Sequence, residues 1–315
     1  MSKPSATFSA IIPNYNHSGY ILNTLDAAIG QTAPFDEIIV IDDASTDNSV
    51  TLIEARIRNI PCARLIRNAQ NMGVIRSSNL GVKEATGDFI CYLSADDHYD
   101  RHLVEWCHEM LRQYPDLGMI SGNTRIHNVT TGTQHRLILP FAQKMACYSG
   151  QNIEAISKKR AFTFNIGANV VRRDAVIAAG QLIQALEWHA DWFLYLVIAC
   201  RHPFGVVPHE FVHVRQGGNQ YSDACNDWKK QRPVIEAFIR TLRKDYPAEY
   251  AFFRRCALLP TYDFQALGLL WREPDLRDYL TPLLAWRLLT YKPLRMAGRW
   301  MPSSLRARAR QWLKV

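Results

Sequence analysis

Two pairs of adjacent acidic residues follow short apolar runs that have the composition of buried β-strands. Asp96 and Asp97 end the stretch "DFICYLSADD", and Asp42 and Asp43 end "EIIVIDD". A polar turn, "PNYN", closes a third such run near the start of the chain. Apolar runs that alternate with helical patterns predict a mostly parallel sheet covered by helices on both faces. Because ligands bind beyond the carboxyl ends of such strands, the three clusters predict one site at one edge of the sheet.

The adjacent carboxylates of Asp96 and Asp97 have two interpretations. An acid ahead of a helix caps its free amides, but Asp100 lies closer to the helical run that follows and is available for that task. Two like charges side by side repel each other, and a divalent cation relieves the repulsion because hard cations bind carboxylate and phosphate oxygens. We therefore favour a metal site at Asp96 and Asp97 over a helix cap.

Asp42 and Asp43 also have two interpretations, and the sequence leaves both open. Acids favour turns, and a carboxylate can equally contact the base or ribose of a nucleotide. Two interpretations also stay open for the turn of Pro13, Asn14 and Tyr15. Its tyrosine is either a half-buried turn residue or an aromatic face on which a base stacks.

Asp191 lies in "EWHADWFLYL", where it is either a polar residue at the start of an amphipathic helix or a functional acid. Its neighbours are aromatic. A carboxylate that is partly desolvated among aromatic side chains suits a general base, so Asp191 is a candidate catalytic residue.

The composition is that of a soluble globular protein, with 315 residues, 48% of them hydrophobic and 21% charged. The longest apolar run, Trp192–Cys200, is shorter than the ~18–20 residues that span a bilayer. The absence of a secretory signal and of paired cysteine spacings predicts a cytoplasmic protein with reduced thiols. Strand–helix alternation predicts an α/β domain over residues 1–225, and helices interrupted by prolines predict a helical region over 226–315.

Five stretches, taken in order, resemble the family 2 glycosyltransferases, which have the GT-A nucleotide-sugar fold. They are "SAIIPNYNHSGYILNTLDAAIGQT", "DEIIVIDDASTDNS", "NMGVIRSSNLGVKEATGDFICYLSADDHYDRHLVE", "NIGANVVRRDAV" and "EWHADWFL". The resemblance covers about residues 7–225 and rests on the ordered set rather than on one motif. It implies a Rossmann-like, mostly parallel sheet flanked by helices, with a C-terminal helical appendage.

The resemblance implies a role for each polar cluster. Asp96 occupies the last acidic position of the family's DxD motif, which holds a divalent metal on the donor diphosphate, and Asp97 supports it. Asp191 matches the position of the catalytic base. The residues implied around the nucleotide and its phosphates are Pro13, Tyr15, Asp42, Asp43 and Arg76.

Three positions depart from the family's pattern. Ser94 replaces the first acid of the DxD motif, which makes metal binding depend more on Asp97. Ser78 stands where the family often has an arginine, and Arg76 is the nearest arginine. The segment after Arg215 lacks a histidine that would complete a metal site.

The implied reaction moves a sugar from a UDP-, GDP- or dTDP-sugar to a hydroxyl of a saccharide or lipid-linked acceptor, in bacterial cell-surface polysaccharide or glycolipid synthesis. Mg²⁺ or Mn²⁺ would neutralise the leaving diphosphate, and one carboxylate on the opposite face would give inversion. One alternative is a nucleotidyltransferase, although "IIPNYNHSGY" lacks the basic residue of a phosphate loop. The other is a non-catalytic protein that binds a sugar nucleotide.

The net charge of +8 is concentrated near the C-terminal end. From Thr281 onward eight residues are basic and none is acidic, whereas the preceding residues carry 29 of each sign. Ser303–Leu313 has the pattern of an amphipathic helix, which either packs on the protein or lies on an anionic membrane surface. Charge confined to one segment argues against a nucleic-acid partner.

We expect the full chain to sediment with anionic liposomes and a chain that ends near residue 280 to stay in solution, because the basic excess lies in residues 281–315. Neutral liposomes are the control. Equal sedimentation of the two chains would contradict a peripheral membrane location through this segment.

Overall fold

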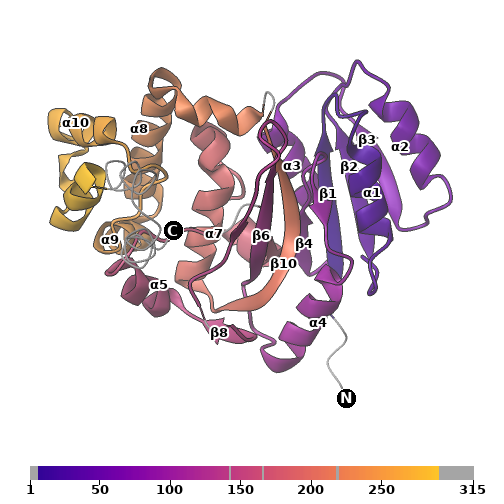
Figure 1. The fold of residues 1–315 in the computed structure, drawn as a ribbon, viewed down its shortest axis with the longest axis horizontal. Coiled ribbons are helices and arrows are strands. Elements are labelled where there is room, and N and C mark those ends of the chain that lie inside the picture. Colours follow the sequence, from indigo (N-terminus) through magenta and orange to yellow (C-terminus); the bar gives the residue numbers. More distant parts are fainter. Residues whose placement is uncertain (1–5, 142, 165–166, 218–219, 291–315) are drawn as a thin grey trace. The chain divides into compact units, whose positions relative to one another are not determined.

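The computed structural model describes residues 6–141, 143–164, 167–217 and 220–290 (Figure 1). The predicted helix Ser303–Leu313 lies outside these residues. In the described ranges, no helix has the length and apolar character needed to cross a bilayer. The chain divides into two compact units. Unit 1 consists of Met1–Tyr148, Phe164–Gln184 and Phe193–Asn219, and unit 2 consists of Ser149–Thr163, Ala185–Trp192 and Gln220–Val315.

Unit 1 is built on one sheet with the strand order β3-β2-β1-β4-β9-β6-β10-β5, to which β7 adds beside β6 and β8 beside β10. Strands β3, β2, β1 and β4 are parallel, as are β6 and β10, whereas β9 is antiparallel to both of its neighbours. The predicted α/β fold is confirmed. The strands are β1 (Phe8–Asn14), β2 (Glu37–Asp42), β3 (Ala63–Arg67), β4 (Phe89–Tyr92), β5 (His98–Tyr99), β6 (Met119–Asn128), β7 (Gln134–Leu137), β8 (Ala146–Tyr148), β9 (Asn169–Arg172) and β10 (Phe204–Gln216).

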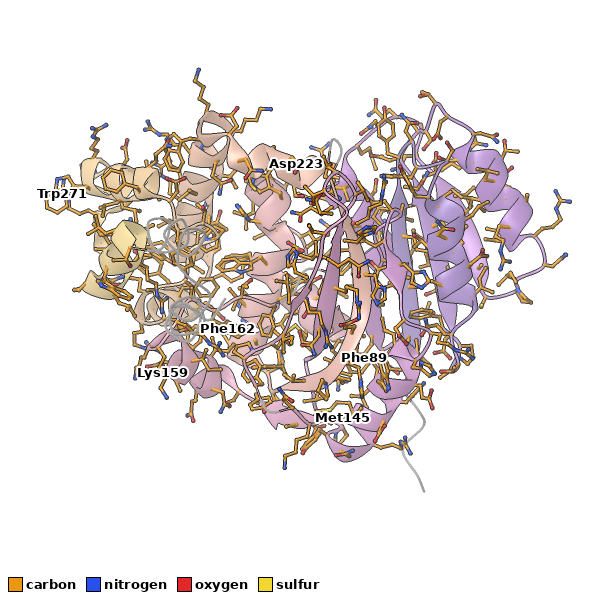
Figure 2. All side chains as sticks on the ribbon, in the orientation of Figure 1. Phe89, Met145, Lys159, Phe162, Asp223 and Trp271 are labelled. Atoms are coloured by element: carbon orange, nitrogen blue, oxygen red, sulfur yellow. The ribbon has the colours of Figure 1, made fainter. Side chains whose placement is uncertain are left out.

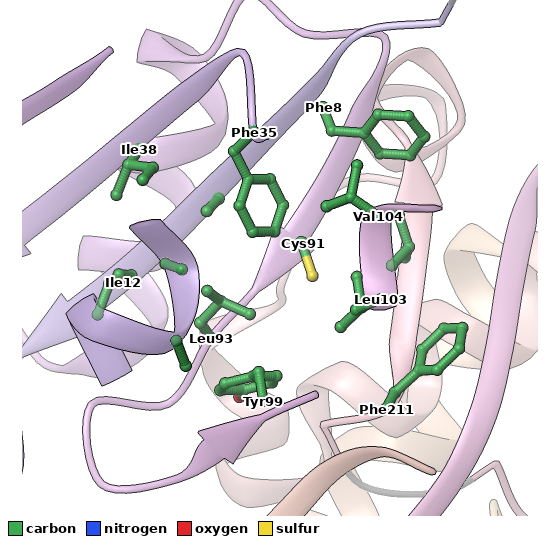
Figure 3. Packing of buried hydrophobic residues seen from close by; sticks show 14 of the residues in the cluster. Phe8, Ile12, Phe35, Ile38, Cys91, Leu93, Tyr99, Leu103, Val104 and Phe211 are labelled. Carbon is green, nitrogen blue, oxygen red and sulfur yellow. The ribbon is translucent and has the colours of Figure 1, made fainter. Parts of the chain in front are cut away.

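Alternating residues of the central strands are buried on both faces of the sheet. Phe8 and Ile12 of β1 belong to a core cluster that also contains residues of α1, α2 and α4 (Figure 3). Ile11 faces the other side, where Gly81 of α3 lies so close that an added Cβ would meet the isoleucine side chain. Strands covered on both faces read as continuous apolar runs. The helices of this unit are α1 (Ile21–Ile29), α2 (Ser49–Ile57), α3 (Val74–Glu84), α4 (Leu103–Gln113) and α6 (Arg173–Ala178).

The sequence pattern predicts a helix over Glu187–Cys200 and a strand over residues 162–171, and both boundaries are wrong. The helix predicted to begin at Glu187 begins at Ala190, as α7 (Ala190–Arg201), because Glu187 has φ 46° and ψ −127° and breaks the short 3-10 segment Gln184–His189. Among the described residues of the predicted strand 162–171, only Asn169 onward is strand, as β9 (Asn169–Arg172).

The prediction that Asp100 caps the following helix is wrong. Its Oδ1 accepts a hydrogen bond from the N–H of His102, 2.9 Å away, whereas α4 begins at Leu103. The preceding residues His98 and Tyr99 form β5, which pairs with β10. The pairing of β5 with β10, which lies far away in the sequence, therefore lengthens the loop after β4, so α4 begins later than the sequence pattern suggests.

Unit 2 packs its helices around aromatic side chains. The ring of Phe238 on α8 lies 5.9 Å from that of Phe253 on α9 and 5.7 Å from that of Trp192. Trp271 points away from α10 and is 66% exposed (Figure 2). The helices are α5 (Gly150–Ser157), α8 (Trp228–Asp245), α9 (Pro247–Arg255) and α10 (Phe264–Arg272), with 3-10 segments Tyr221–Asn226 and Arg277–Tyr279 and a last helix over residues 282–290.

Arg287 is buried in unit 2, with 3% of its surface exposed. Its guanidinium donates to the carbonyl oxygens of Cys256 (2.8 Å) and Ala257 (3.0 Å) after α9, and to those of Ser157 and Arg160 (2.9 Å) at and after the end of α5. Carbonyls at helix C-terminal ends lack intrahelical partners and attract cations. The expectation that this arginine contributes to a basic surface is wrong. The liposome comparison therefore needs a shortened chain that ends after residue 290 and not near residue 280, because the shorter chain would lose these contacts.

We expect Gly81→Val to lower the free energy of unfolding by about 1–3 kcal/mol, because the new side chain would overpack against Ile11. The matched control is Gly268→Val, also within a helix, where an added Cβ meets nothing within 4 Å. Urea denaturation of both variants measures the difference. Equal loss in the two would show that helix propensity, and not the contact with the sheet, sets the effect.

Candidate active site

Side-chain hydrogen bonds join the loops that follow β1 and β2. Asn14 Nδ2 donates to Asp42 Oδ1 (2.8 Å) and Ser45 Oγ (3.1 Å), and Ser45 donates its N–H and O–H to the same carboxylate (3.0 and 2.6 Å). Asp42 is 1% exposed, so its carboxylate holds two loops together. Asn14 Oδ1 is also buried and has no hydrogen-bond partner in the described part of the chain, which leaves an acceptor at the end of β1.

Asp43 organises the loop that leads into α3. It accepts hydrogen bonds from Asn68 Nδ2 (2.7 Å) and from the N–H groups of Met72 (2.9 Å) and Gly73 (2.7 Å). Gly73 has φ 87°, a conformation that glycine adopts readily. Burial raises the pKa of Asp43, but these hydrogen bonds outweigh it and hold the pKa below its usual range. The ionised carboxylate therefore fixes the start of α3, whose first turn presents the exposed side chain of Arg76.

The loop after β4 places its two acids differently. Asp97 is 5% exposed, and its Oδ1 accepts from the N–H of Arg215 at 2.9 Å. Thr24 of α1 donates to the backbone carbonyl of Asp97 at 2.8 Å. Burial, together with the charge of Asp96, raises the pKa of Asp97 to about 7. Asp96 is half-buried, and within the described residues its carboxylate has no hydrogen bond or ion pair.

These two acids fit a divalent cation of the Mg²⁺ type. Among the described residues no group of three or more His, Cys, Asp or Glu side chains is placed to hold a metal, so a cation here would need ligands beyond the protein. Mg²⁺ usually takes one or two carboxylates and completes its shell with substrate phosphates and water. Asp96 has no partner among the described residues and lies beside Asp97, whose pKa is raised by burial and by the charge of Asp96, so the pair matches this donor set.

Arg215 and Tyr20 lie beside this loop, although the sequence analysis gave neither side chain a role in the site. The guanidinium carbon of Arg215 lies 3.9 Å from the centre of the Tyr20 ring, and its backbone binds Asp97, 118 residues away in the sequence. Residues so far apart form no local sequence pattern. Only the folded chain shows that Arg215 lies next to Asp97.

Asp191 is at the start of α7, in unit 2. It is half-buried and its Oδ1 accepts from the N–H of Trp192 at 2.7 Å. Burial raises the pKa of Asp191 to about 6. Gln231 holds the preceding residues, since its Oε1 accepts from Trp188 Nε1 (2.7 Å) and its Nε2 donates to His189 Nε2 (2.7 Å). Burial lowers the pKa of His189 to about 4, so the imidazole is neutral and accepts.

A hollow of ≈ 490 Å³ opens in unit 2 beside this segment. Glu187, which carries the strained backbone, accepts a hydrogen bond from the hydroxyl of Tyr221. Strained residues persist where their surroundings over-determine them, and they concentrate at functional sites. The hollow is lined by Ala185, Glu187, Trp188, Ala224, Lys230, Pro233 and Val234.

The predicted site residues fall in both units. Asp191 belongs to unit 2. In unit 1, Tyr15 is 43% exposed beside the buried Asn14, and the hydrogen bonds of Asp42 and Asp43 are to other residues of the loops. The structure brings together, at the carboxyl edge of the sheet, the loops that carry Pro13, Tyr15, Asp42, Asp43, Arg76, Asp96 and Asp97.

Comparisons with known proteins agree with this fold. Residues 9–179 match the family described as Glycosyl transferase family 2. The protein "Uncharacterized glycosyltransferase YibD" of Escherichia coli (strain K12) is 37% identical over 287 residues, which are 88% of this chain and 83% of YibD. A chondroitin synthase of Escherichia coli is 32% identical over 121 residues, which are 38% of this chain but 17% of the synthase, so the chain spans under a fifth of that relative.

A solved structure shares the architecture at low sequence identity. The crystal structure of S. aureus TarS 1-349 in complex with UDP-GlcNAc has a TM-score of 0.56 and 14% identity, and the match covers 91% of this chain and 92% of that one. This likeness shows that the mixed α/β sheet of unit 1 belongs to a GT-A fold. The chain belongs to glycosyl transferase family 2.

Proposed function

We propose that the protein transfers a sugar from a nucleoside diphosphate sugar to a hydroxyl group of a saccharide or lipid-linked acceptor, with inversion at the anomeric carbon. The observation that carries this proposal is the acidic edge of unit 1, where buried acids frame the loops and Asp96 has no partner among the described residues. The relationship to a chondroitin synthase supports a role in the synthesis of a bacterial cell-surface polysaccharide or glycolipid.

The donor would bind to unit 1. The exposed ring of Tyr15 offers a stacking face for the base. The exposed guanidinium of Arg76 would neutralise phosphate charge. UDP-GlcNAc is the first donor to test because the TarS structure of the same fold contains it, with GDP- and dTDP-sugars as the alternatives.

Asp96, supported by Asp97, would hold Mg²⁺ or Mn²⁺ against the donor diphosphate. A bound cation of this kind stabilises the negative charge that develops on the leaving group. The protein itself would fix the loop that carries Asp96. Thr24 binds the backbone carbonyl of Asp97 and Arg215 binds its side chain, so the position of the adjacent Asp96 is set.

Asp191 would accept the proton of the acceptor hydroxyl. The hydroxyl oxygen forms a bond to the anomeric carbon while the bond from that carbon to the diphosphate oxygen breaks, and the nucleoside diphosphate leaves with the electron pair. A base with a raised pKa holds a proton more strongly than an ordinary aspartate does, while it is still ionised at neutral pH. The nearby hollow with Glu187, Trp188 and Lys230 would receive the acceptor sugar.

We expect Asp191→Asn to lower kcat about 10²–10⁴-fold, the usual contribution of a general base, with donor affinity unchanged. In the wild type, log(kcat/KM) should rise with pH up to about 6 and then level off, because burial raises the pKa of this carboxyl group to about 6 and the base acts when deprotonated. Steady-state rates between pH 5 and 8 measure both effects.

The control for this prediction is Asp245→Asn, an exposed acid at the end of α8 in the same unit. It should keep the wild-type rate and pH profile. Wild-type turnover by Asp191→Asn would remove the assigned base. Binding of a donor without any transfer would favour the non-catalytic alternative, and nucleotide transfer to a sugar phosphate would favour the nucleotidyltransferase.

A donor that binds the folded chain should raise its stability by about 2–3 kcal/mol at about a hundredfold excess over Kd. We expect the increase with UDP-GlcNAc to need Mn²⁺ and to be lost in Asp96→Asn, since that change removes the unpartnered carboxylate. Thermal shift with UDP-, GDP- and dTDP-sugars, with and without Mn²⁺, measures this. Asp116→Asn, an exposed acid of unit 1, is the control, and a full shift in Asp96→Asn would argue against the metal assignment.

A further inference from the structure

Gln231 is a buried polar side chain to which the proposed reaction gives no role. It lies in the first turn of α8 and is 2% exposed. A buried amide must satisfy both its oxygen and its nitrogen. Its Oε1 accepts from Trp188 Nε1 and its Nε2 donates to His189 Nε2, each at 2.7 Å. The amide is therefore committed to the short segment that leads to Asp191.

The start of α8 gives this amide a fixed origin. Asp227 caps the helix, since its Oδ1 accepts from the N–H of Lys229 at 2.9 Å. The N–H of Gln231 donates to the carbonyl oxygen of Asp227, also at 2.9 Å. A side-chain cap satisfies one of the free amides of a first helical turn and holds that turn in place. Gln231 therefore reaches the segment before Asp191 from a rigid element.

The same segment is held a second time, at Glu187. The backbone of Glu187 has φ 46° and ψ −127°, which residues with a side chain rarely adopt. Such a conformation persists where its surroundings over-determine it. The hydroxyl of Tyr221 donates to the carboxylate of Glu187. Residues 187, 188 and 189 therefore each have a side-chain bond to a residue within 221–231.

The residue after Asp191 is fixed as well. Trp192 Nε1 donates to Thr163 Oγ1 at 3.0 Å, and the ring of Trp192 lies 5.7 Å from that of Phe238 and 6.1 Å from that of Phe253. The N–H of Trp192 donates to Asp191 Oδ1 at 2.7 Å. Asp191 therefore lies between two anchored segments, and the position of its carboxylate depends on both.

We infer that Gln231 is a positioning residue for the carboxylate of Asp191, which it places through Trp188 and His189. The inference rests on the proposed function in taking Asp191 as the base. Trp188 also lines the hollow proposed for the acceptor, so one amide holds both a wall of that hollow and the approach to the base. A displacement of about 1 Å can lower a rate about 10²-fold, because the reacting groups must meet in a defined geometry.

Gln231→Met tests the inference, because methionine has a similar length but can neither accept from Trp188 nor donate to His189. We expect kcat for UDP release from UDP-GlcNAc with Mn²⁺ to fall about 10–100-fold, with the donor KM within about twofold of the wild type. Burial raises the pKa of Asp191 to about 6, and a loosened turn would let water reach this carboxylate. The acidic limb of log(kcat/KM) should therefore move down by at least about one pH unit.

Gln231→Glu is the conservative variant. One oxygen of its carboxylate accepts from Trp188, and the other accepts from His189 once that imidazole has taken a proton from solvent. Both bonds survive, so we expect kcat to stay within about fivefold of the wild type. Trp188→Phe removes only the indole N–H and should shift the pH profile less than Gln231→Met, in the same direction. Gln265→Met, the same change at an exposed glutamine of unit 2, is the matched control and should behave as the wild type.

A carbon-13 NMR titration of the Asp191 carboxyl group, assigned with Asp191→Asn, tests the inference without a substrate. The pKa of this group should fall by at least about one unit in Gln231→Met and stay unchanged in Gln265→Met. A lower unfolding midpoint in Gln231→Met with wild-type kcat, pH profile and carboxyl pKa would show a purely structural role and overturn the inference. Failure of Gln231→Glu to keep the rate would overturn it too. If Asp191→Asn kept full transfer, the assigned base would fail, while the shifted carboxyl pKa would still show that Gln231 positions this group.

Discussion

A buried carboxyl group must be hydrogen-bonded or neutral, and this constraint shapes the acidic edge of the sheet. Asp42, Asp43 and Asp97 are each 5% exposed or less. Asp42 and Asp43 meet the constraint with several donors each, and the pKa of Asp43 stays low. Asp97 has fewer donors, so burial raises its pKa to about 7, and the charge of Asp96 adds to the increase. Aspartates at the same edge of the sheet therefore have pKa values shifted in opposite directions, down for Asp43 and up for Asp97.

The loops follow from these bonds. Asp42 ties the loop after β1 to the loop after β2, Asp43 ties the latter to the start of α3, and Asp97 ties the loop after β4 to β10. Within this frame, the half-buried Asp96 has no hydrogen bond or ion pair with a described residue. In a glycosyltransferase of family 2, a rigid frame around one available carboxylate would hold a donor without reorganisation during the reaction.

Unit 2 uses buried polar side chains in the same way. Arg287 satisfies carbonyls at the ends of two helices, and Gln231 holds both Trp188 and His189 next to Asp191. The environment of the candidate base is therefore set by α8, a helix more than thirty residues later in the chain. Its raised pKa is a property of this packing and not of the local sequence.

The sequence by itself determined the alternation of strands and helices, the buried centre of the sheet and the position of the acids at strand ends. These features depend on hydrophobic periodicity and on turn residues, which are local. Family membership followed from the ordered motifs for the same reason. The starts of two helices were predicted wrongly. α4 begins later because β5 pairs with β10, and α7 begins later because Glu187 has a non-helical backbone conformation.

Only the tertiary structure decided which of Asp96 and Asp97 is hydrogen-bonded within the protein and which is available to a ligand. Asp96 and Asp97 are adjacent and chemically identical in the sequence, yet Asp97 accepts a hydrogen bond from Arg215, 118 residues later, whereas Asp96 has no partner in the part of the chain that the structure describes. The same applies to Arg287, which counted as surface charge until its carbonyl partners from α5 and α9 were known. Hydrogen-bond partners far apart in the chain meet only when the core packs, and that packing is not written in any local pattern.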